Sequence, residues 1–238
     1  FHTCGLCTLR DCLRCCATSA RPTLPVTTRL TPKDGRYRVQ SADVRMVITD
    51  PENAEKVESV RAECPTVERR LLVGGARAGW ESFGAVMKRA STEIALDKTR
   101  SEDPLMVYFT SGTTAGPKMV LHTQVSYGLA HRLTGKYWLD LRPSDLHWNL
   151  SDTGWAKAAY SNFFGPWHMG AALLIVDDRG KFDSKRCLAL LEKYAVTTFC
   201  APPTAYRMLV LEDLRQSKLT RLRHCVGAGE PLNPEVIE

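Results

Sequence analysis

Short apolar runs alternate along this chain with longer segments in which apolar residues recur every three or four positions. The runs that we expect to form strands are 45–49, 70–73, 105–109, 171–176, 197–200 and 223–226. The segments that we expect to be helical are one that starts at Pro51 and others at 80–90, 126–138, 152–167, 182–194 and 204–214. Short strands that alternate with longer helices predict βαβ units. We therefore expect an α/β fold of mostly parallel sheets with flanking helices.

Local signals indicate the ends and the inner faces of several helices. Asp50 can cap the helix that starts at Pro51, because a short acceptor side chain followed by proline suits a helix N-terminus. Apolar residues with helical spacing should face inward. They are Ala54, Val57 and Val60 in the first helix, Phe83, Val86 and Met87 in the second, and Phe182, Cys187, Leu190 and Leu191 in the helix at 182–194.

Three loops of unusual composition follow predicted strands, at 110–118, 201–203 and 227–231. Ligands of parallel α/β sheets bind at the carboxyl ends of the strands. The strongest signal is the first loop, which offers four hydroxyls, two glycines and a lysine within nine residues. Glycines allow backbone N–H groups to approach an anion, and the lysine supplies a positive charge for phosphates. The loop is not a Walker A loop, because its glycines and lysine do not have the spacing of that motif. The alternative interpretation is a polar turn whose lysine has no ligand-binding role.

The composition is typical of a soluble globular protein, with 44% hydrophobic and 24% charged residues. The net charge of +6 is interleaved with acidic residues, so we expect no nucleic-acid partner. No apolar run approaches the roughly 20 residues that span a bilayer, so we expect no membrane span.

The nine cysteines fall into two groups. Scattered along the chain are Cys64, Cys187, Cys200 and Cys225, which we expect to be buried free thiols. Crowded at the start are Cys4, Cys7, Cys12, Cys15 and Cys16, either as metal ligands or as part of an atypical N-terminus. Their two CxxC pairs are closer together than in zinc ribbons, so we expect no metal site and place 1–23 outside the fold.

The motif Tyr-Phe-Thr-Ser-Gly-Thr-Thr-Ala-Gly-Pro-Lys at 108–118 resembles the signature of the adenylate-forming superfamily, the AMP-binding enzymes. The resemblance is closer to the mitochondrial medium-chain acyl-CoA synthetases. Four further stretches carry it, at 62–65, 151–155, 201–207 and 229–235, in an order and spacing that resemble the family over about 30–238. The resemblance implies that 24–238 is part of the large N-terminal domain of such an enzyme, with the C-terminal domain absent from the chain.

The resemblance also implies roles for individual residues. The ATP-binding residues would be Thr110, Ser111, Gly112, Thr113, Thr114, Ala115, Gly116, Pro117 and Lys118, with Lys118 and Thr113 catalytic. Gly229 and Glu230 would lie beside the adenylate. The substrate pocket would include Trp155, Pro203 and Tyr206. For Trp155 the alternative is a tryptophan buried in the core. For Pro202, Pro203 and Tyr206 the alternative is a rigid strand-to-helix turn. For the lone His122 and His168 we expect structural roles.

Two positions depart from the family pattern. Ala115 stands where the family usually has glycine, so a positive φ at that position would strain the loop. Val26 and Arg29 stand where a similar turn of the family has glycine and glutamine, which puts a coenzyme A contact there in doubt.

The function that the resemblance implies is ATP-dependent activation of a medium-chain carboxylic acid to acyl-AMP and then acyl-CoA. ATP, Mg²⁺ and coenzyme A would take part, and the location would be the mitochondrial matrix. One alternative is an inactive nucleotide-binding remnant, which the absence of the family's downstream motifs favours. Under either interpretation we expect that these 238 residues alone make no acyl-CoA. Another is a different adenylate-forming ligase, against which the stretch 152–155 argues.

Overall fold

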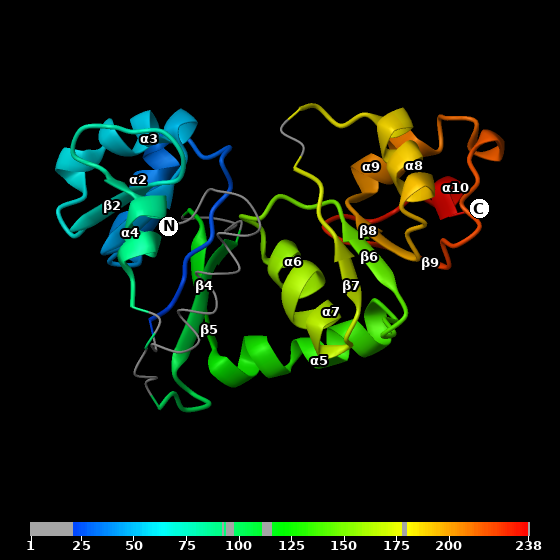
Figure 1. The fold of residues 1–238 in the computed structure, drawn as a ribbon, viewed down its shortest axis with the longest axis horizontal. Helices are drawn as coiled ribbons and strands as arrows, with labels where there is room; N and C mark the ends of the chain where they lie inside the picture. Colours follow the sequence, from blue (N-terminus) through cyan, green and yellow to red (C-terminus); the bar gives the residue numbers. More distant parts are fainter. Residues whose placement is uncertain (1–20, 92, 94–97, 111–115, 178–179, 238) are drawn as a thin grey trace. The chain divides into compact units, whose positions relative to one another are not determined.

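The computed structural model describes residues 21–91, 93, 98–110, 116–177 and 180–237. The chain forms two compact units. Unit 1 contains the described residues up to Tyr127 together with Thr153–Ala156, and unit 2 contains Gly128–Asp152 and the described residues from Lys157 onward. Figure 1 follows the chain from unit 1 in blue and cyan to the end of unit 2 in red.

Strands and helices alternate through both units, as expected. The strands are β1 (Met46–Thr49), β2 (Arg69–Leu72), β3 (Glu81–Ser82), β4 (Pro104–Thr110), β5 (Lys118–Thr123), β6 (Leu146–Asn149), β7 (Ala172–Leu174), β8 (Thr198–Ala201) and β9 (His224–Gly227). The α-helices are α2 (Pro32–Ser41), α3 (Pro51–Glu58), α4 (Phe83–Arg89), α5 (His131–Leu133), α6 (Ala156–Ala159), α7 (Gly165–His168), α8 (Ser184–Lys193), α9 (Pro203–Leu209) and α10 (Pro234–Ile237). Shorter or wider helical turns are η1 (Arg61–Glu63), η2 (Gln124–Leu129), η3 (Thr134–Trp138), η4 (Tyr160–Phe164) and η5 (Leu214–Gln216).

Unit 1 is built on a three-stranded parallel sheet in the order β1-β2-β3. Its buried cluster consists of Leu24, Val26, Val39, Val44, Val47, Cys64 and Val107. Asp50 caps α3 as predicted, because its carboxylate accepts a hydrogen bond from the Asn53 amide at 2.9 Å. Helix α2, which the apolar pattern did not predict, starts with a capping box between Thr31 and Asp34.

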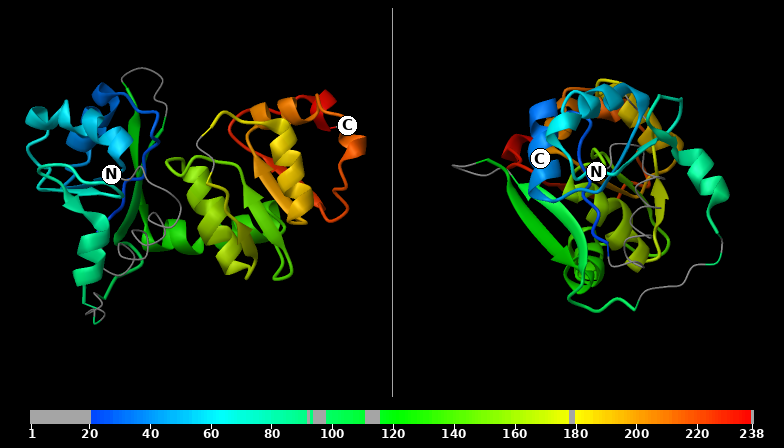
Figure 2. Two further views of the ribbon diagram at one scale, coloured as in Figure 1. Left: turned by 45° about the horizontal axis from the view of Figure 1, so that its top comes forward. Right: turned by 90° about the vertical axis from the view of Figure 1, so that its left-hand side faces the viewer.

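Strands β4 and β5 form a separate antiparallel pair within unit 1. The two turned views of Figure 2 show them side by side as a two-stranded ribbon. Strand β4 was predicted from its apolar run, whereas β5 was not. The exposed positions of Met119 and Leu121 explain this, because one face of the ribbon lacks the buried side chains that a sequence pattern can detect.

Unit 2 contains a four-stranded, all-parallel sheet in the order β7-β6-β8-β9. Side chains alternate between its two faces, as they must in a strand. Phe199 and Ala201 of β8 pack with α8 and α9, whereas Cys200 packs on the opposite face with Leu139 and Leu141. Side chains of α8 and α9 therefore cover one face, and Leu139 and Leu141, which follow η3, cover the other. The arrangement confirms the α/β fold with mostly parallel sheets.

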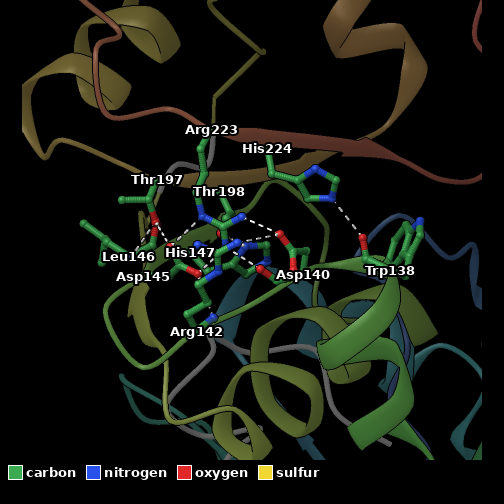
Figure 3. A network of polar contacts seen from close by, with 10 residues as sticks. All are labelled: Trp138, Asp140, Arg142, Asp145, Leu146, His147, Thr197, Thr198, Arg223 and His224. Atoms are coloured by element: carbon green, nitrogen blue, oxygen red, sulfur yellow. Dashed lines mark hydrogen bonds and ion pairs between the residues drawn. The ribbon is translucent and has the colours of Figure 1, made fainter.

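A polar network joins the amino ends of three neighbouring strands in unit 2 (Figure 3). Asp145, Thr197 and Arg223 stand immediately before β6, β8 and β9. The Asp145 carboxylate accepts hydrogen bonds from the Thr197 hydroxyl at 2.8 Å and from the Arg223 guanidinium at 2.5 and 3.1 Å. Arg223 also pairs with Asp140 at 2.6 Å. The network lies at the edge of the sheet opposite to the carboxyl ends of the strands, so we assign it to stability.

Three expectations about individual elements were wrong. Met87 is 50% exposed and α4 buries no side chain, because the helix lies outside the buried cluster of unit 1. Strand β7 covers only part of 171–176 and lies at one edge of the described sheet, so Ile175 is 49% exposed. Cys64, Cys187 and Cys200 are buried free thiols as predicted, but Cys225 is exposed, on the strand at the other edge of that sheet.

Candidate functional site

The Gly/Thr-rich loop connects β4 to β5, and the residues at its two ends face each other. Thr110 and Lys118 are partners in the antiparallel register, and both are exposed. Among the described residues Lys118 has no ion-pair partner, so its ammonium is accessible to a ligand. The intervening predicted site residues lie outside the described part of the chain; they are Ser111, Gly112, Thr113, Thr114 and Ala115.

Helix α2 holds the exit of this loop. The Tyr37 hydroxyl donates a hydrogen bond to the Pro117 carbonyl at 3.0 Å. Gly116 has a φ of +95°, a conformation that favours glycine. The Tyr37 ring also packs edge-on against Phe109 of β4, at 5.9 Å between ring centroids. The resemblance raised the question of strain at position 115, and the structure places a positive φ at the glycine that follows it.

The stretch 151–155 contributes a close backbone contact and an exposed ring. A Cβ on Gly154 would lie 2.0 Å from the Thr27 backbone nitrogen and 2.1 Å from the Val26 carbonyl carbon, so only glycine fits there. Trp155 is 60% exposed, which excludes the alternative of a core tryptophan. Its indole is therefore available to line a pocket.

In unit 2, the loops after β8 and β9 lie at the same edge of the sheet, as predicted for neighbouring parallel strands. Gly229 has a φ of +119°. Arg207 of α9 pairs with the Glu230 carboxylate at 3.3 Å and donates to the Pro231 carbonyl at 3.1 Å. Helix α9 thus holds the far side of the turn that contains both predicted adenylate-side residues.

Pro203 and Tyr206 lie at the start of α9. Pro203 is buried in the first turn of the helix, where a missing N–H costs nothing. The Tyr206 hydroxyl lies 2.9 Å from the Val226 carbonyl oxygen and 3.1 Å from that of Phe199, so its single proton is shared between β8 and β9. Burial raises the pKa of Tyr206 far above its usual value, which keeps the hydroxyl protonated. These contacts favour the strand-to-helix turn.

The histidines have partners within the fold. His122 packs against Tyr127 with ring centroids 4.8 Å apart, and burial lowers its pKa. His168 lies 2.7 Å from the Gly128 carbonyl oxygen. His147, which no sequence pattern indicated, is fully buried between the Thr198 hydroxyl at 2.8 Å and the Ser161 hydroxyl at 3.2 Å. These contacts indicate structural roles.

Sequence reasoning also missed a polar group at the carboxyl end of β6. Lys157 is half-buried, and its ammonium donates to the Ala228 carbonyl at 2.9 Å. The Asn149 amide nitrogen donates to the Lys157 carbonyl at 3.3 Å, while its oxygen is buried and has no hydrogen-bond partner among the described residues. The available signal was the single lysine in the otherwise uncharged segment 153–167.

Two negative findings apply to the described residues. No group of three or more His, Cys, Asp or Glu side chains lies close enough together there to hold a metal ion. No helix in the same part of the chain has both the length and the apolar character needed to cross a membrane.

Comparisons with known proteins agree on one family. The family described as "AMP-binding enzyme" matches residues 16–238. The mitochondrial acyl-coenzyme A synthetase ACSM4 of Rattus norvegicus is 45% identical over 90% of this chain and 37% of its own length. The mitochondrial acyl-coenzyme A synthetase ACSM3 of Mus musculus is 44% identical over 94% of this chain and 38% of its own length. The chain therefore spans well under half the length of these curated relatives.

A solved structure shows the same fold. The anthranilate CoA ligase AuaEII, determined in complex with anthranoyl-AMP, superposes with a TM-score of 0.78 and is 28% identical. The match covers 89% of this chain and 42% of the ligase. The α/β architecture is thus that of part of the large N-terminal domain of an adenylate-forming ligase, and the chain belongs to the AMP-binding enzyme family.

Proposed function

We propose that this chain carries the nucleotide-binding part of an enzyme that activates a medium-chain carboxylic acid. In the proposed reaction the carboxylate attacks the α-phosphate of ATP, which forms acyl-AMP and releases pyrophosphate. The thiol of coenzyme A then attacks the acyl carbonyl, which forms acyl-CoA and releases AMP. Support comes from the acyl-coenzyme A synthetases among the relatives and from a similar ligase that binds anthranoyl-AMP.

The observation that carries the proposal is the pairing of Thr110 with Lys118 at the end of the β4–β5 hairpin. It leaves an exposed hydroxyl and an exposed ammonium at the two ends of a loop rich in glycine and threonine. Hydroxyl and backbone N–H groups bind phosphate oxygens, and an ammonium neutralises the charge of the outer phosphates. Contacts that are held in place before the ligand arrives need little rearrangement when it binds.

The other roles follow the family resemblance. Thr113 acts with Lys118 on the phosphates, and the turn that contains Gly229 and Glu230 lies beside the adenylate. Trp155, Pro203 and Tyr206 border the acyl chain. Mg²⁺ would enter together with ATP, held mainly by phosphate oxygens and water, and we assign none of the described side chains to it.

The remaining assignments concern the whole protein. ATP and coenzyme A are the co-substrates, and the mitochondrial matrix is the location, as for the relatives named above. Residues 24–238 form part of the N-terminal domain, and Thr23 belongs to it as well, because it is buried and its backbone hydrogen-bonds to Leu105 and Val107 of β4.

The test measures nucleotide binding to the purified 238-residue chain by calorimetry. Wild type should bind ATP, and Lys118→Ala should weaken ATP binding by about 10-fold to 100-fold, the usual effect of losing one charge-assisted contact. AMP lacks the outer phosphates, so its affinity should not change. The matched control is Lys88→Ala, which removes an exposed lysine of α4 and should alter neither affinity.

Two results would contradict the proposal: a wild-type chain that does not bind ATP, or equal ATP affinity of Lys118→Ala and wild type. A second assay follows AMP release from ATP in the presence of octanoate and coenzyme A. Release that requires octanoate supports acid activation. ATP binding without such release agrees with the expectation that these 238 residues alone make no acyl-CoA.

A further inference from the structure

We infer that Lys157 is a positioning residue that holds the turn 227–230 in the shape needed for the adenylate. The turn follows β9, and its central carbonyl, that of Ala228, accepts a hydrogen bond from the Lys157 ammonium at 2.9 Å. The inference that Lys157 shapes the turn stands on this contact. Only the identity of the ligand rests on the proposed function.

The environment of Lys157 sets it apart from the surface lysines. Its side chain is half-buried, and burial lowers the pKa of its ammonium. No ion pair among the described residues involves it. A partly desolvated ammonium therefore has a backbone carbonyl as its acceptor, and hydrogen bonds from a charged donor are stronger than those from neutral groups.

The turn needs external support because of its composition. Ala228 lies between Gly227 and Gly229, and Gly229 has a φ of +119°. Glycines restrict the backbone least, so such a segment samples many conformations unless other groups hold it. Tyr206 holds the strand just before the turn through the Val226 carbonyl.

Helix α9 also holds the far side of the turn, where Arg207 contacts Glu230 and Pro231. Neither this contact nor that of Tyr206 involves the central Ala228 carbonyl. The only support of that carbonyl among the described side chains is therefore Lys157.

Lys157 approaches from the other face of the sheet. Its neighbour Ser161 contacts His147, and alternation along β6 directs His147 to the face opposite Trp148, which packs with α8 and α9. The Asn149 amide ties the Lys157 backbone to the end of β6. Lys157 stands on α6, and its side chain reaches from there to the turn after β9, which β8 separates from β6.

The experiment compares Lys157→Met, Lys157→Gln and Lys157→Arg with wild type. Methionine keeps the apolar stem and removes the donor, glutamine is a shorter neutral donor, and arginine keeps a long charged donor. Lys185→Met, which removes an exposed lysine of α8, is the matched control. Amide hydrogen exchange of peptides covering 227–231 and 198–201 is measured without ligand, and AMP affinity is measured by calorimetry.

We expect Lys157→Met to speed exchange at 227–231 by about tenfold and to leave 198–201 unchanged, because only the turn loses a contact. AMP affinity should fall about five- to tenfold in the same variant. Lys157→Arg should restore both values at least in part, and Lys157→Gln should resemble Lys157→Met. A residue with a purely structural role would instead change exchange in β8 together with the turn.

Unchanged exchange at 227–231 in Lys157→Met would overturn the inference, and so would an equal change at 198–201. If Lys157→Met does not fold, the same criteria apply to Lys157→Gln. Failure of the proposed function has a different signature: wild type would not bind AMP, while the effect of the substitution on exchange at the turn would persist.

Discussion

The hydroxyl of Tyr37 donates a hydrogen bond to the carbonyl of Pro117, 80 residues further along the chain, at 3.0 Å. This bond ties α2 to the exit of the Gly/Thr-rich loop. Tyr37 is partly exposed, so the free energy of the bond is moderate. Its importance lies in where it acts, because Pro117 directly precedes the lysine that we assign to the phosphates.

Replacing Tyr37 by phenylalanine should loosen this exit. The expected loss is about 0.5–1.5 kcal/mol of unfolding free energy, since one hydrogen bond is removed and the ring contact with Phe109 remains. ATP affinity should fall as well. Urea unfolding and calorimetry measure the two effects, with Tyr137→Phe as a control because Tyr137 is 71% exposed. ATP affinity equal to that of wild type would show that the bond does not shape the loop.

Replacing Gly116 by alanine should destabilise the chain by about 1 kcal/mol or more, because an L side chain rarely adopts its φ of +95°. A clash would not be the cause, since the nearest Tyr37 atoms would lie 3.8 Å from the new Cβ. Gly84→Ala in α4 is the matched control and should have the opposite sign, because alanine favours a helix. Thermal unfolding of both variants decides the point, and destabilisation of equal size in both would contradict strain at Gly116.

Replacing Asp145 by asparagine should cost about 3 kcal/mol at neutral pH, because a buried charged acceptor of Arg223 is lost. Burial opposes ionisation of the Asp145 carboxyl, but hydrogen bonds from Arg223, Thr197 and the Arg142 amide hold its pKa below the usual range. Since the folded pKa lies below the unfolded one, the contribution to stability is complete above the unfolded value of 3.8. It is lost as pH falls through the folded pKa.

Urea unfolding of the Asp145 variant between pH 7 and pH 3 tests this prediction. The difference in unfolding free energy between wild type and Asp145→Asn should shrink below about pH 4. Glu102→Gln, at an exposed position, serves as the control and should follow wild type throughout. A difference that stays constant down to pH 3 would show that ionisation of Asp145 does not contribute.

Protonation of His147 should destabilise the fold at mildly acidic pH. Burial lowers its pKa from 6.5 to about 4, so the unfolded chain binds the proton more readily than the folded one. Neutral His147 therefore contributes fully above pH 6.5, and this contribution is lost as pH falls toward 4. The whole loss amounts to about 3 kcal/mol.

Unfolding free energies measured between pH 7 and pH 4 should show this slope in wild type and lack it in His147→Asn. His168→Asn, which changes an exposed histidine, should keep the wild-type slope. A slope of the same size in His147→Asn would assign the pH dependence to another group.

Features that depend on neighbouring residues could be predicted from the sequence. The apolar run Thr197–Cys200 predicted β8, and Asp50 followed by Pro51 predicted the start of α3. The composition of the loop 110–118 indicated a phosphate site, because its hydroxyls, glycines and lysine are adjacent in the chain.

Features that depend on distant partners could not be predicted in this way. Strand β6 lies at the centre of the unit 2 sheet, yet its residues include His147 and Asn149, so it lacks the uniform apolar run by which the other strands were recognised. Strand β5 exists because it pairs with β4, and none of its own side chains is buried. The polar side chain of His147 can be buried in β6 because Thr198 and Ser161, which are distant in the sequence, form hydrogen bonds with it.

By itself the sequence determined the α/β class and the Gly/Thr-rich loop, because each depends on residue types at short spacing, and its motifs resemble those of the AMP-binding family. The tertiary structure alone decided that Tyr37 supports Pro117, that Asp145 and Arg223 join the amino ends of the strands, and that Lys157 reaches Ala228. These pairs are separated by 71 to 80 residues. Strand order and helix placement bring them together, and neither property is encoded in the local pattern of apolar and polar positions.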